Sequence, residues 1–426
     1  MKLTTTGKEL WRAAVFVPVL VFCLVLAETA RTKEMEVARG SVKPETFGSP
    51  EGCMCHSDLR SQWTKSMHAK ALDDPLYQAV LNKAKKEAGA AVGEYCETCH
   101  APGAIMMNTI DRAKGNIADT GITCSFCHQV TAQTANEPGN TSLGFPQDGP
   151  DGVYRAHITD HKAMHPAGSI ELFGSAEFCG ACHNVNHPAN RTPLETTYTE
   201  WKESSYAKDG ITCQNCHMSA VPDTRAPYRA AAAMGAPTRD NIFAMTFIGS
   251  NVAQGGGADA KSLLETAASV KIEAPEIVAP GTGAKAKVSV TNKGAGHSLP
   301  TGLTEVRRMW LDISLIGADG TVEKLGTEEF SVVLKDGKGN VGVDVWNAAG
   351  VESDTRIKAG ATYTKEVTIA MPRNAAESKR LVATLNYQSA PDELATAAGV
   401  ENPITKMASS EIEIYPNKEA KTKGNR

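Results

Sequence analysis

The stretch Cys96-Glu97-Thr98-Cys99-His100 carries the pattern that decides the fold of the first half of this chain. Two thiols three positions apart are followed at once by an imidazole, and this Cys-x-x-Cys-His motif returns at residues 124–128, 179–183 and 213–217. In such a motif the two thiols bond covalently to haem, and the histidine binds the iron from the proximal side. The spacing therefore predicts four covalently attached haems of the c type.

A shorter copy, Cys53-Met54-Cys55-His56, lacks one spacer residue. We expect it to hold a fifth haem c, through a single thioether or with a dedicated attachment system. The five motifs use ten of the eleven cysteines. The predicted haem-binding cysteines are Cys53, Cys55, Cys96, Cys99, Cys124, Cys127, Cys179, Cys182, Cys213 and Cys216. The predicted proximal iron ligands are His56, His100, His128, His183 and His217.

Zinc sites and disulfides are the competing interpretations of these cysteines. Paired Cys-x-x-Cys units also bind structural zinc, and exported cysteines can oxidise to disulfides. Neither chemistry requires a histidine after every pair. Four complete copies and one near-copy therefore favour haem.

The charge balance excludes one class of partner. The formal net charge is −4, and the haem propionates make the loaded protein more acidic still, so nucleic acid is not an expected partner. Aromatic residues make up only 6% of the chain. This low content fits a haem-binding half in which porphyrin rings fill the interior in place of apolar side chains. A length of 426 residues suits two domains.

The N-terminus has the layout of an export signal. Lys2, Lys8 and Arg12 precede an uncharged apolar run at residues 13–27, and a polar stretch follows. We expect residues 1–31 to be a signal peptide or, if uncleaved, an N-terminal membrane anchor at residues 13–27. Either way, the bulk of the chain is expected on the periplasmic or extracellular side of the membrane.

Residues 47–245 are rich in cysteine and histidine and are predicted to form the multihaem domain. This segment contains a weak internal repeat, because the eight residues from Trp63 match the eight from Trp201 at Trp, Ser, Ala and Lys. Tyr206 stands where the first copy has His68. Residues 131–152 are predicted to form a long surface loop, and the glycines at 255–257 a linker.

Beyond the glycines the hydrophobic pattern changes to a period of two. Residues 285–290, 305–316, 363–371 and 379–387 read as strands, separated by Asp-Gly turns. An antiparallel, immunoglobulin-like β-sandwich is therefore predicted over residues 269–415. Residues 416–426 form a charged tail that we expect to be disordered. The predicted fold class is a two-domain α + β protein, with a mostly helical or irregular haem domain followed by the sandwich.

The axial position opposite each proximal histidine decides between electron transfer and catalysis. Methionine is a possible ligand at one site, but the remaining histidines are sufficient for every iron. A spacing of four residues places three of them on one stripe of a helix that Pro166 ends. Another lies between Gly296 and Ser298 in a loop that could reach across the domain boundary, or be an ordinary turn histidine. The candidate distal ligands are His68, His157, His161, His165, His187 and His297.

Several short runs of sequence, taken together, resemble the cytochrome c-554-type multihaem family over residues 52–218. They are Cys55-His56, Gln62-Trp63, Ser66-Met67-His68-Ala69, Asp74-Pro75, Glu200-Trp201, Gly210-Ile211-Thr212-Cys213 and Cys216-His217-Met218. The resemblance implies an electron carrier with closely packed haems and makes His68 a distal ligand. Relatives in the wider group include multihaem oxidoreductases of nitrogen compounds. This chain departs from the family pattern at the short first motif and at Tyr206.

Two functions from different classes follow from these observations. The first is an exported pentahaem cytochrome, without catalysis of its own, that carries single electrons through bis-histidine haems between redox proteins or a membrane redox complex. The second is a multihaem oxidoreductase that acts on nitrite or hydroxylamine at one haem with an open axial site. We favour the carrier, because the sequence shows no lysine-ligated haem or further catalytic residues. The strand-rich half could in addition serve as a docking module.

Overall fold

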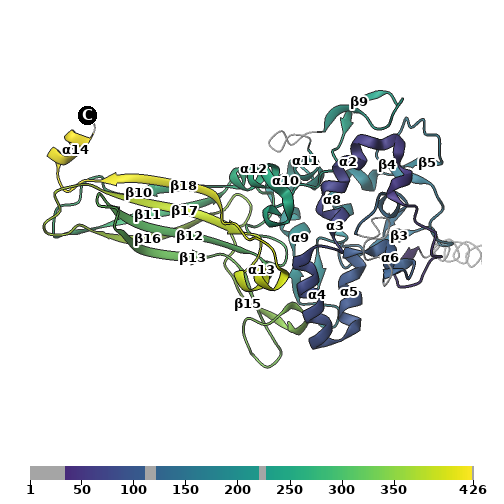
Figure 1. Cartoon of the computed structure of the whole chain (residues 1–426), viewed down its shortest axis with the longest axis horizontal. Helices are drawn as coiled ribbons and strands as arrows, with labels where there is room; N and C mark the ends of the chain where they lie inside the picture. Colours follow the sequence, from purple (N-terminus) through teal and green to yellow (C-terminus); the bar gives the residue numbers. More distant parts are fainter. Residues whose placement is uncertain (1–33, 111–120, 220–226, 425–426) are drawn as a thin grey trace, which may run out of the picture.

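The computed structural model describes residues 34–110, 121–219 and 227–424. The predicted signal peptide or anchor, including residues 13–27, lies outside this part of the chain. The molecule is elongated, with a helix-rich half at one end and a long strand-rich half at the other (Figure 1). None of the helices in the described ranges combines the length and the apolar character that a membrane span needs.

The longest helices of the first half form an antiparallel hairpin that leads directly into a haem motif. Asp74 caps the start of α4 (Pro75–Ala88) by accepting a hydrogen bond from the Leu76 N–H, and proline occupies the first helical position. Gly89 has φ +92° and ends the helix, because this backbone conformation is open to glycine. Helix α5 (Ala90–His100) follows at once and ends on the proximal histidine.

Shorter helices carry the remaining motifs and the turns around them. The α-helices are α2 (Ser57–Lys65), α3 (Met67–Lys70), α6 (Pro102–Met106), α7 (Cys124–His128), α8 (Ala176–Gly180), α9 (Thr197–Lys202), α10 (Ser205–Lys208) and α11 (Cys213–His217). The 3-10 helices are η1 (Pro50–Gly52), η2 (Met54–His56) and η4 (Glu171–Gly174). Two-stranded sheets pair β6 (Val185–Asn186) with β7 (Pro193–Glu195), and β8 (Tyr228–Ala231) with β9 (Thr238–Ile242).

The predicted surface loop at residues 131–152 is partly wrong. It contains β2 (Ala132–Gln133) and β3 (Leu143–Phe145), and β3 lies between β2 and β1 (Met35–Glu36) in a small sheet. Leu143 and Phe145 are buried, and Phe145 packs against the rings of Phe47 and Phe126. Two apolar side chains in a strand of three residues are too few to show a period, so the glycine-rich surroundings concealed the strand.

The predicted helix over His157, His161 and His165 is wrong. These residues lie in an irregular segment between β4 (Tyr154–Ala156) and β5 (Ala167–Ser169), which pair in parallel. Parallel pairing makes the intervening chain cross back along β4, so the spacing of four no longer places the histidines on one face.

The strand-rich half consists mainly of two antiparallel sheets that enclose one core. The first has the order β10-β11-β16, and the second the order β13-β12-β17-β18. Their strands are β10 (Ala268–Glu273), β11 (Gly283–Asn292), β12 (Arg308–Gly317), β13 (Val322–Glu329), β16 (Thr362–Ala370), β17 (Lys379–Gln388) and β18 (Thr405–Ile414). The predicted antiparallel sheets are therefore present, and their immunoglobulin-like class stays a prediction.

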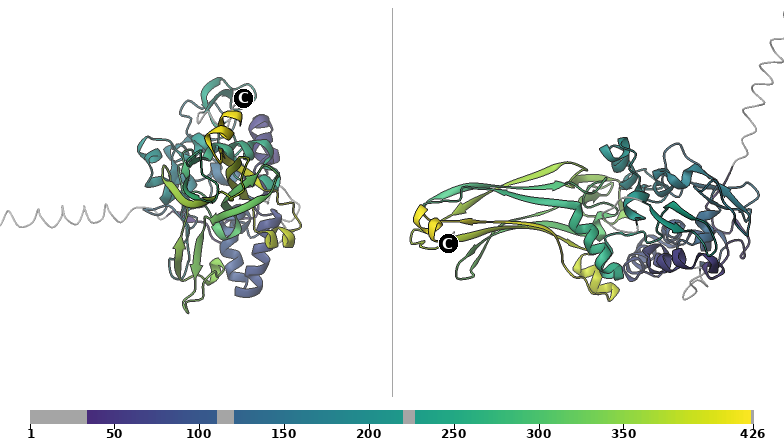
Figure 2. Two further views of the ribbon diagram at one scale, coloured as in Figure 1. Left: turned by 90° about the vertical axis from the view of Figure 1, so that its left-hand side faces the viewer. Right: turned by 90° about the horizontal axis from the view of Figure 1, so that it is seen from above.

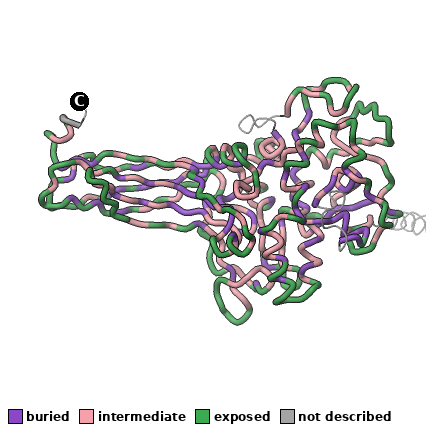
Figure 3. The backbone as a smooth tube through the Cα atoms, viewed as in Figure 1, coloured by how far each residue is buried: buried purple, intermediate pink, exposed green. Residues whose placement is uncertain are grey.

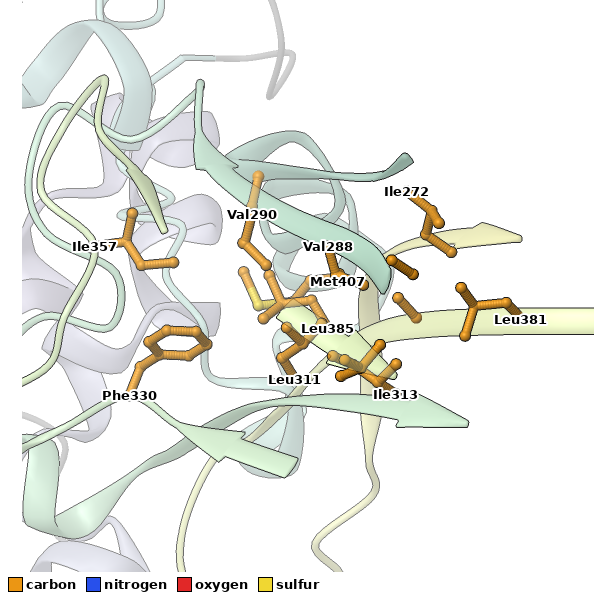
Figure 4. Close-up of a cluster of buried hydrophobic side chains, with 14 of the residues drawn as sticks. Ile272, Val288, Val290, Leu311, Ile313, Phe330, Ile357, Leu381, Leu385 and Met407 are labelled. Atoms are coloured by element: carbon orange, nitrogen blue, oxygen red, sulfur yellow. The ribbon is translucent and has the colours of Figure 1, made fainter. Parts of the chain in front are cut away.

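The core between these sheets follows the alternation of the sequence. Met309, Leu311, Ile313 and Leu315 of β12 are all buried on one face. Side chains from both sheets point into this shared core (Figure 4), and the buried stripe runs along the inside of the strands (Figure 3). Seen from above, the strands form two long layers that extend away from the helices (Figure 2).

The predicted glycine linker is a folded connection. A helical turn, η5 (Val252–Gly256), leads directly into α12 (Gly257–Ala267), and Gly255 and Gly257 have φ +87° and +55°. The glycines are required here for the backbone conformation of the kink and not for flexibility. The predicted disordered tail is also corrected, because residues of it form α14 (Lys418–Gly424).

The two halves meet in a polar and apolar boundary. Leu76 of α4 packs against Ala395 of α13 (Asp392–Ala398). Lys83 lies 2.8 Å from the Asp344 carboxylate, and its ammonium lies 5.6 Å from the centre of the Trp346 ring. Smaller elements complete this edge: η6 (Thr304–Val306), η7 (Val345–Asn347), and the pair β14 (Val332–Lys335) and β15 (Gly350–Asp354).

Candidate haem-binding site

Each complete motif lies on or next to a short helical turn. The copies at 96–100, 124–128 and 213–217 are within α5, α7 and α11, and the copy at 179–183 spans the end of α8. An α-helix brings residues three and four positions apart onto one face, so both thiols and the imidazole can point toward one haem. The short motif lies on the 3-10 helix η2. A 3-10 helix has fewer residues per turn than an α-helix. It can therefore keep the two cysteines and the histidine close together although one spacer residue is missing.

Every proximal histidine is anchored through Nδ1. Backbone carbonyls accept from four of them, and the Glu195 carboxylate accepts from the fifth, His183, at 3.1 Å. An acceptor at Nδ1 fixes the orientation of a metal-binding imidazole and leaves Nε2 to the metal. The carbonyl partners are Ala232 for His56, Ala71 for His100, Arg155 for His128 and Ile248 for His217.

Three of these proximal histidines each face a second histidine ring, and the distance between the two ring centres is the same in all three pairs. Two imidazoles that share one metal through bonds of about 2 Å have ring centres about 6 Å apart. The ring centres in each of the three pairs are 6.3 Å apart. The pairs are His56 with His165, His68 with His183, and His217 with His297. This spacing fits one iron held between each pair.

The surroundings of the buried pairs favour the neutral imidazole that binds metal. Burial lowers the pKa of His68 to about 3 and the pKa of His217 to about 4. Two distal rings are also anchored at Nδ1, since His165 donates to the Pro166 carbonyl at 3.0 Å and His297 to the Ser298 carbonyl at 2.9 Å. Their Nε2 atoms are therefore left for iron.

The proximal histidines His100 and His128 contact aromatic rings. Tyr77 stacks on His100 with ring centres 3.7 Å apart, and Phe173 stacks on His128 at 5.0 Å. Within the described ranges, no second histidine ring is in ring contact with either of them. The structure therefore does not assemble a distal ligand for these two sites.

Within the described ranges, the other three candidate distal histidines make no ring contact with a proximal one. His157 Nε2 donates to the Asn241 carbonyl at 3.0 Å, and His187 Nε2 to the Trp346 carbonyl at 3.3 Å. His161 is exposed at the edge of the cavity. Ligation of iron by these three residues stays a prediction.

The internal repeat forms two equivalent supports for haem motifs. Trp63 Nε1 donates to the Ile122 carbonyl at 2.9 Å, and Trp201 Nε1 to the Ile211 carbonyl at 2.8 Å. Both isoleucines belong to a Gly-Ile-Thr-Cys run that begins a motif, at 121–124 and at 210–213. Each tryptophan therefore fixes the chain just before a haem cysteine. The recurrence of this run is the sequence signal for the pairing, and it was missed.

Tyr206 shows how the second copy replaces the missing histidine. Its hydroxyl donates to the Lys293 carbonyl at 3.1 Å, and its ring lies against Gly296, where an added Cβ would be 3.1 Å from the ring. Where the first copy supplies His68 itself, the second copy supports the loop that presents His297 from the strand-rich half. The ring of His297 thus lies opposite His217 across the domain boundary, and its ligation of a haem iron stays a prediction.

All five motifs line one cavity of about 2120 Å³. Drug-sized ligand pockets measure about 300–1,000 Å³, so this space suits several large groups. None of the ten described motif cysteines forms a disulfide. Cysteine thiols of neighbouring motifs contact one another in three places: Cys53 with Cys124, Cys99 with Cys182, and Cys179 with Cys213.

A cavity lined by repeated Cys-His motifs, with anchored imidazoles facing one another at iron-bridging distance, defines a multihaem c-type cytochrome. Comparison with known proteins agrees. Residues 52–129, which hold three of the motifs, match the family model described as cytochrome c554 and c-prime. The resemblance to this family is therefore confirmed over residues 52–129.

Among solved structures, the chain is similar to a penta-heme cytochrome c552 from Thermochromatium tepidum. The two share 20% identity with a TM-score of 0.61, over 87% of this chain and 100% of that one, which shows a common fold. A CARDB domain from Pyrococcus furiosus (12% identity, TM-score 0.19) covers 35% of this chain and 85% of its own length. A superoxide reductase from Ignicoccus hospitalis (15%, TM-score 0.18) covers 39% and 91%. No curated protein matches the sequence.

Proposed function

We propose that this protein is an exported pentahaem c-type cytochrome that carries single electrons between redox partners. The observation that carries the proposal is the set of three histidine pairs at 6.3 Å. When bound, haem supplies one-electron redox chemistry. Each of the three pairs would hold a haem iron between two imidazoles, which suits electron transfer at these sites.

The short motif supports a fifth haem. His56 is anchored at Nδ1 and faces His165, as the proximal histidines of complete motifs face their partners. Cys53 contacts Cys124, the first cysteine of another motif, in the same way as Cys179 contacts Cys213. The short motif therefore takes part in the pattern of contacts that joins complete motifs.

The contacts between cysteines also suggest a route for electrons. The motif at 179–183 touches the motifs at 96–100 and 213–217, through Cys182 and Cys179 respectively. The short motif touches the one at 124–128. Because each cysteine would be bonded to its haem, these contacts would bring neighbouring haems close together, and the motif at 179–183 would serve as a junction.

The setting and partners of this carrier are inferred from sequence chemistry. The apolar run at residues 13–27 supports export to the periplasmic or extracellular side, with or without a retained anchor. The fitting partners are redox proteins or a membrane redox complex, and nucleic acid is disfavoured by the acidic balance.

A haem count beside electron paramagnetic resonance of the oxidised protein tests the proposal. Five haems by pyridine haemochrome are expected in the wild type, and four in the double variant Cys53→Ser/Cys55→Ser. Four haems in both proteins would contradict the pentahaem assignment. The spectrum is expected to contain at least three low-spin bis-histidine signals. A high-spin signal that changes when nitrite or hydroxylamine is added would instead support an oxidoreductase.

A further inference from the structure

Arg307 from the strand-rich half lies at the boundary with the haem-rich half and lines the haem cavity. It stands between η6 and β12, and its guanidinium packs over Gly302, where an added Cβ would be 3.1 Å from Nη2. Gly302 has φ +79°, so both the turn and the close approach require glycine. The arginine is thus held in place by backbone that has no room for a side chain.

The polar partners of Arg307 are few and neutral. Nη1 is 3.5 Å from the Ser250 hydroxyl and 3.5 Å from the Tyr387 hydroxyl, and these two hydroxyls bond to each other at 2.7 Å. The Nε atom is buried and has no hydrogen-bond partner. Among the described residues, no carboxylate lies within ion-pair distance of this guanidinium. A half-buried cation whose Nε is buried without a partner is costly unless an anion compensates it.

A second arginine at the same boundary shows what a satisfied guanidinium looks like here. Arg356 is also buried and is paired with Glu200 and, at 2.8 Å, with Asp354. Arg356 is therefore paired with carboxylates, whereas Arg307 has none within ion-pair distance. Arg307 lines the cavity, and its Nε has no hydrogen-bond partner.

The nearby acids Glu195, Glu305 and Asp74 act on Arg307 only from beyond ion-pair distance, so none of them makes a direct ion pair with it. Glu195 accepts from His183 and is engaged there. Burial raises the pKa of Asp74, and burial raises the pKa of Glu305 to about 7, so both carboxyls are held toward the neutral form. Asp344 pairs with Lys83.

Other unsatisfied donors line the same cavity. The Tyr77 hydroxyl and Trp346 Nε1 are buried without a partner, and both residues line the cavity wall. Tyr77 lies three residues beyond Asp74, whose carboxyl interacts with Arg307. Unpartnered donors and a cation without an ion pair, all lining one cavity, fit a ligand that brings anionic oxygens.

We propose that Arg307 binds a propionate carboxylate of a haem held in the cavity at the domain boundary. This inference rests on the proposed function, because it requires haem in the cavity. Propionate is the source of anionic oxygen that every bound haem carries, and a guanidinium binds a carboxylate through two parallel hydrogen bonds. The strand-rich half thereby supplies both a distal imidazole, from His297, and the positive charge that neutralises one haem propionate, from Arg307.

Redox titration of the haem-loaded protein tests the proposal. A cation beside a haem favours the reduced iron, so Arg307→Gln is expected to lower the midpoint potential of one haem and leave the others in place. Arg307→Lys keeps the charge and is expected to restore that potential. Arg308→Gln removes a charge from the next residue, which is paired at the surface, and serves as the matched control. Unchanged potentials in Arg307→Gln would overturn the proposal.

Two further measurements separate the possible outcomes. The haem count of each variant is taken first, because fewer than five haems in the wild type would contradict the proposed function and not this inference. Nitrite is then added to the wild type and to Arg307→Gln. A shift of potential in the wild type alone would show that the site takes a free anion, which overturns the propionate assignment. If Arg307→Gln does not fold, a crystal structure of the haem-loaded wild type decides: a propionate on Arg307 is expected, and water or chloride there would be contrary.

Discussion

The substitution Glu200→Gln tests how the strand-rich half is held against the haem domain. Glu200 lies on α9, and its Oε2 accepts from the Ser298 N–H at 3.0 Å and from the Thr301 hydroxyl at 2.7 Å. Its Oε1 accepts from Arg356. One carboxylate therefore binds the loop that presents His297, at two residues after the histidine, and also Arg356 of the strand-rich half.

The size of the effect follows from burial. The side chains of Glu200 and Arg356 are only 10% and 9% exposed, and removing one partner of a buried pair costs about 3–5 kcal/mol. Asp354 remains paired with Arg356 in the variant, so we expect about 3 kcal/mol, the lower end of that range. For a folding unit of about 150–250 residues, a loss of about 3 kcal/mol lowers the melting temperature by about 6–12 °C.

Calorimetry of the loaded protein measures this change, and Glu203→Gln is the matched control. Glu203 is exposed at the end of the same helix, so its substitution is expected to alter stability by about 0.5 kcal/mol or less. A released loop also withdraws His297, which converts one low-spin resonance to high-spin. If the two variants melted within about 2 °C of each other, the argument that Glu200 joins the halves would be refuted.

Three further outcomes are expected. His297→Ala removes the imidazole opposite His217, so one low-spin resonance becomes high-spin at an unchanged haem count; an unaltered spectrum would contradict the pairing. Burial raises the pKa of Glu305 from 4.5 to about 7, so the folded state binds this proton more tightly and stability falls as pH rises across that interval. At 1.36 kcal/mol per unit the fall between about pH 5 and about pH 8 is about 2.5 kcal/mol, and urea unfolding at these two pH values should show it in the wild type but not in Glu305→Gln. Leu311 is fully buried, so Leu311→Ala should cost about 2–5 kcal/mol in the same assay, and a cost below about 1 kcal/mol would argue against the shared core.

Local pattern predicted the elements whose signal is contained in neighbouring residues. The strand over residues 305–316 was predicted from alternation and is observed as β12 (Arg308–Gly317), because one face is buried along its whole length. The helix over the histidines at 157–165 was predicted from spacing and is absent. There the pairing of two short strands, which no local pattern signals, overrides the spacing.

The candidate site divides in the same way. The sequence by itself determined the covalent chemistry, because two thiols and an imidazole within five residues are sufficient to name a haem motif. Only the tertiary structure decided which imidazoles face each other, since His217 and His297 come from different halves of the chain and meet through packing. It also decided that Arg307 reaches the cavity without a carboxylate. The spacing of neighbouring residues in the sequence predicts which of them can bind one haem, whereas contacts between distant residues depend on how whole helices and strands pack.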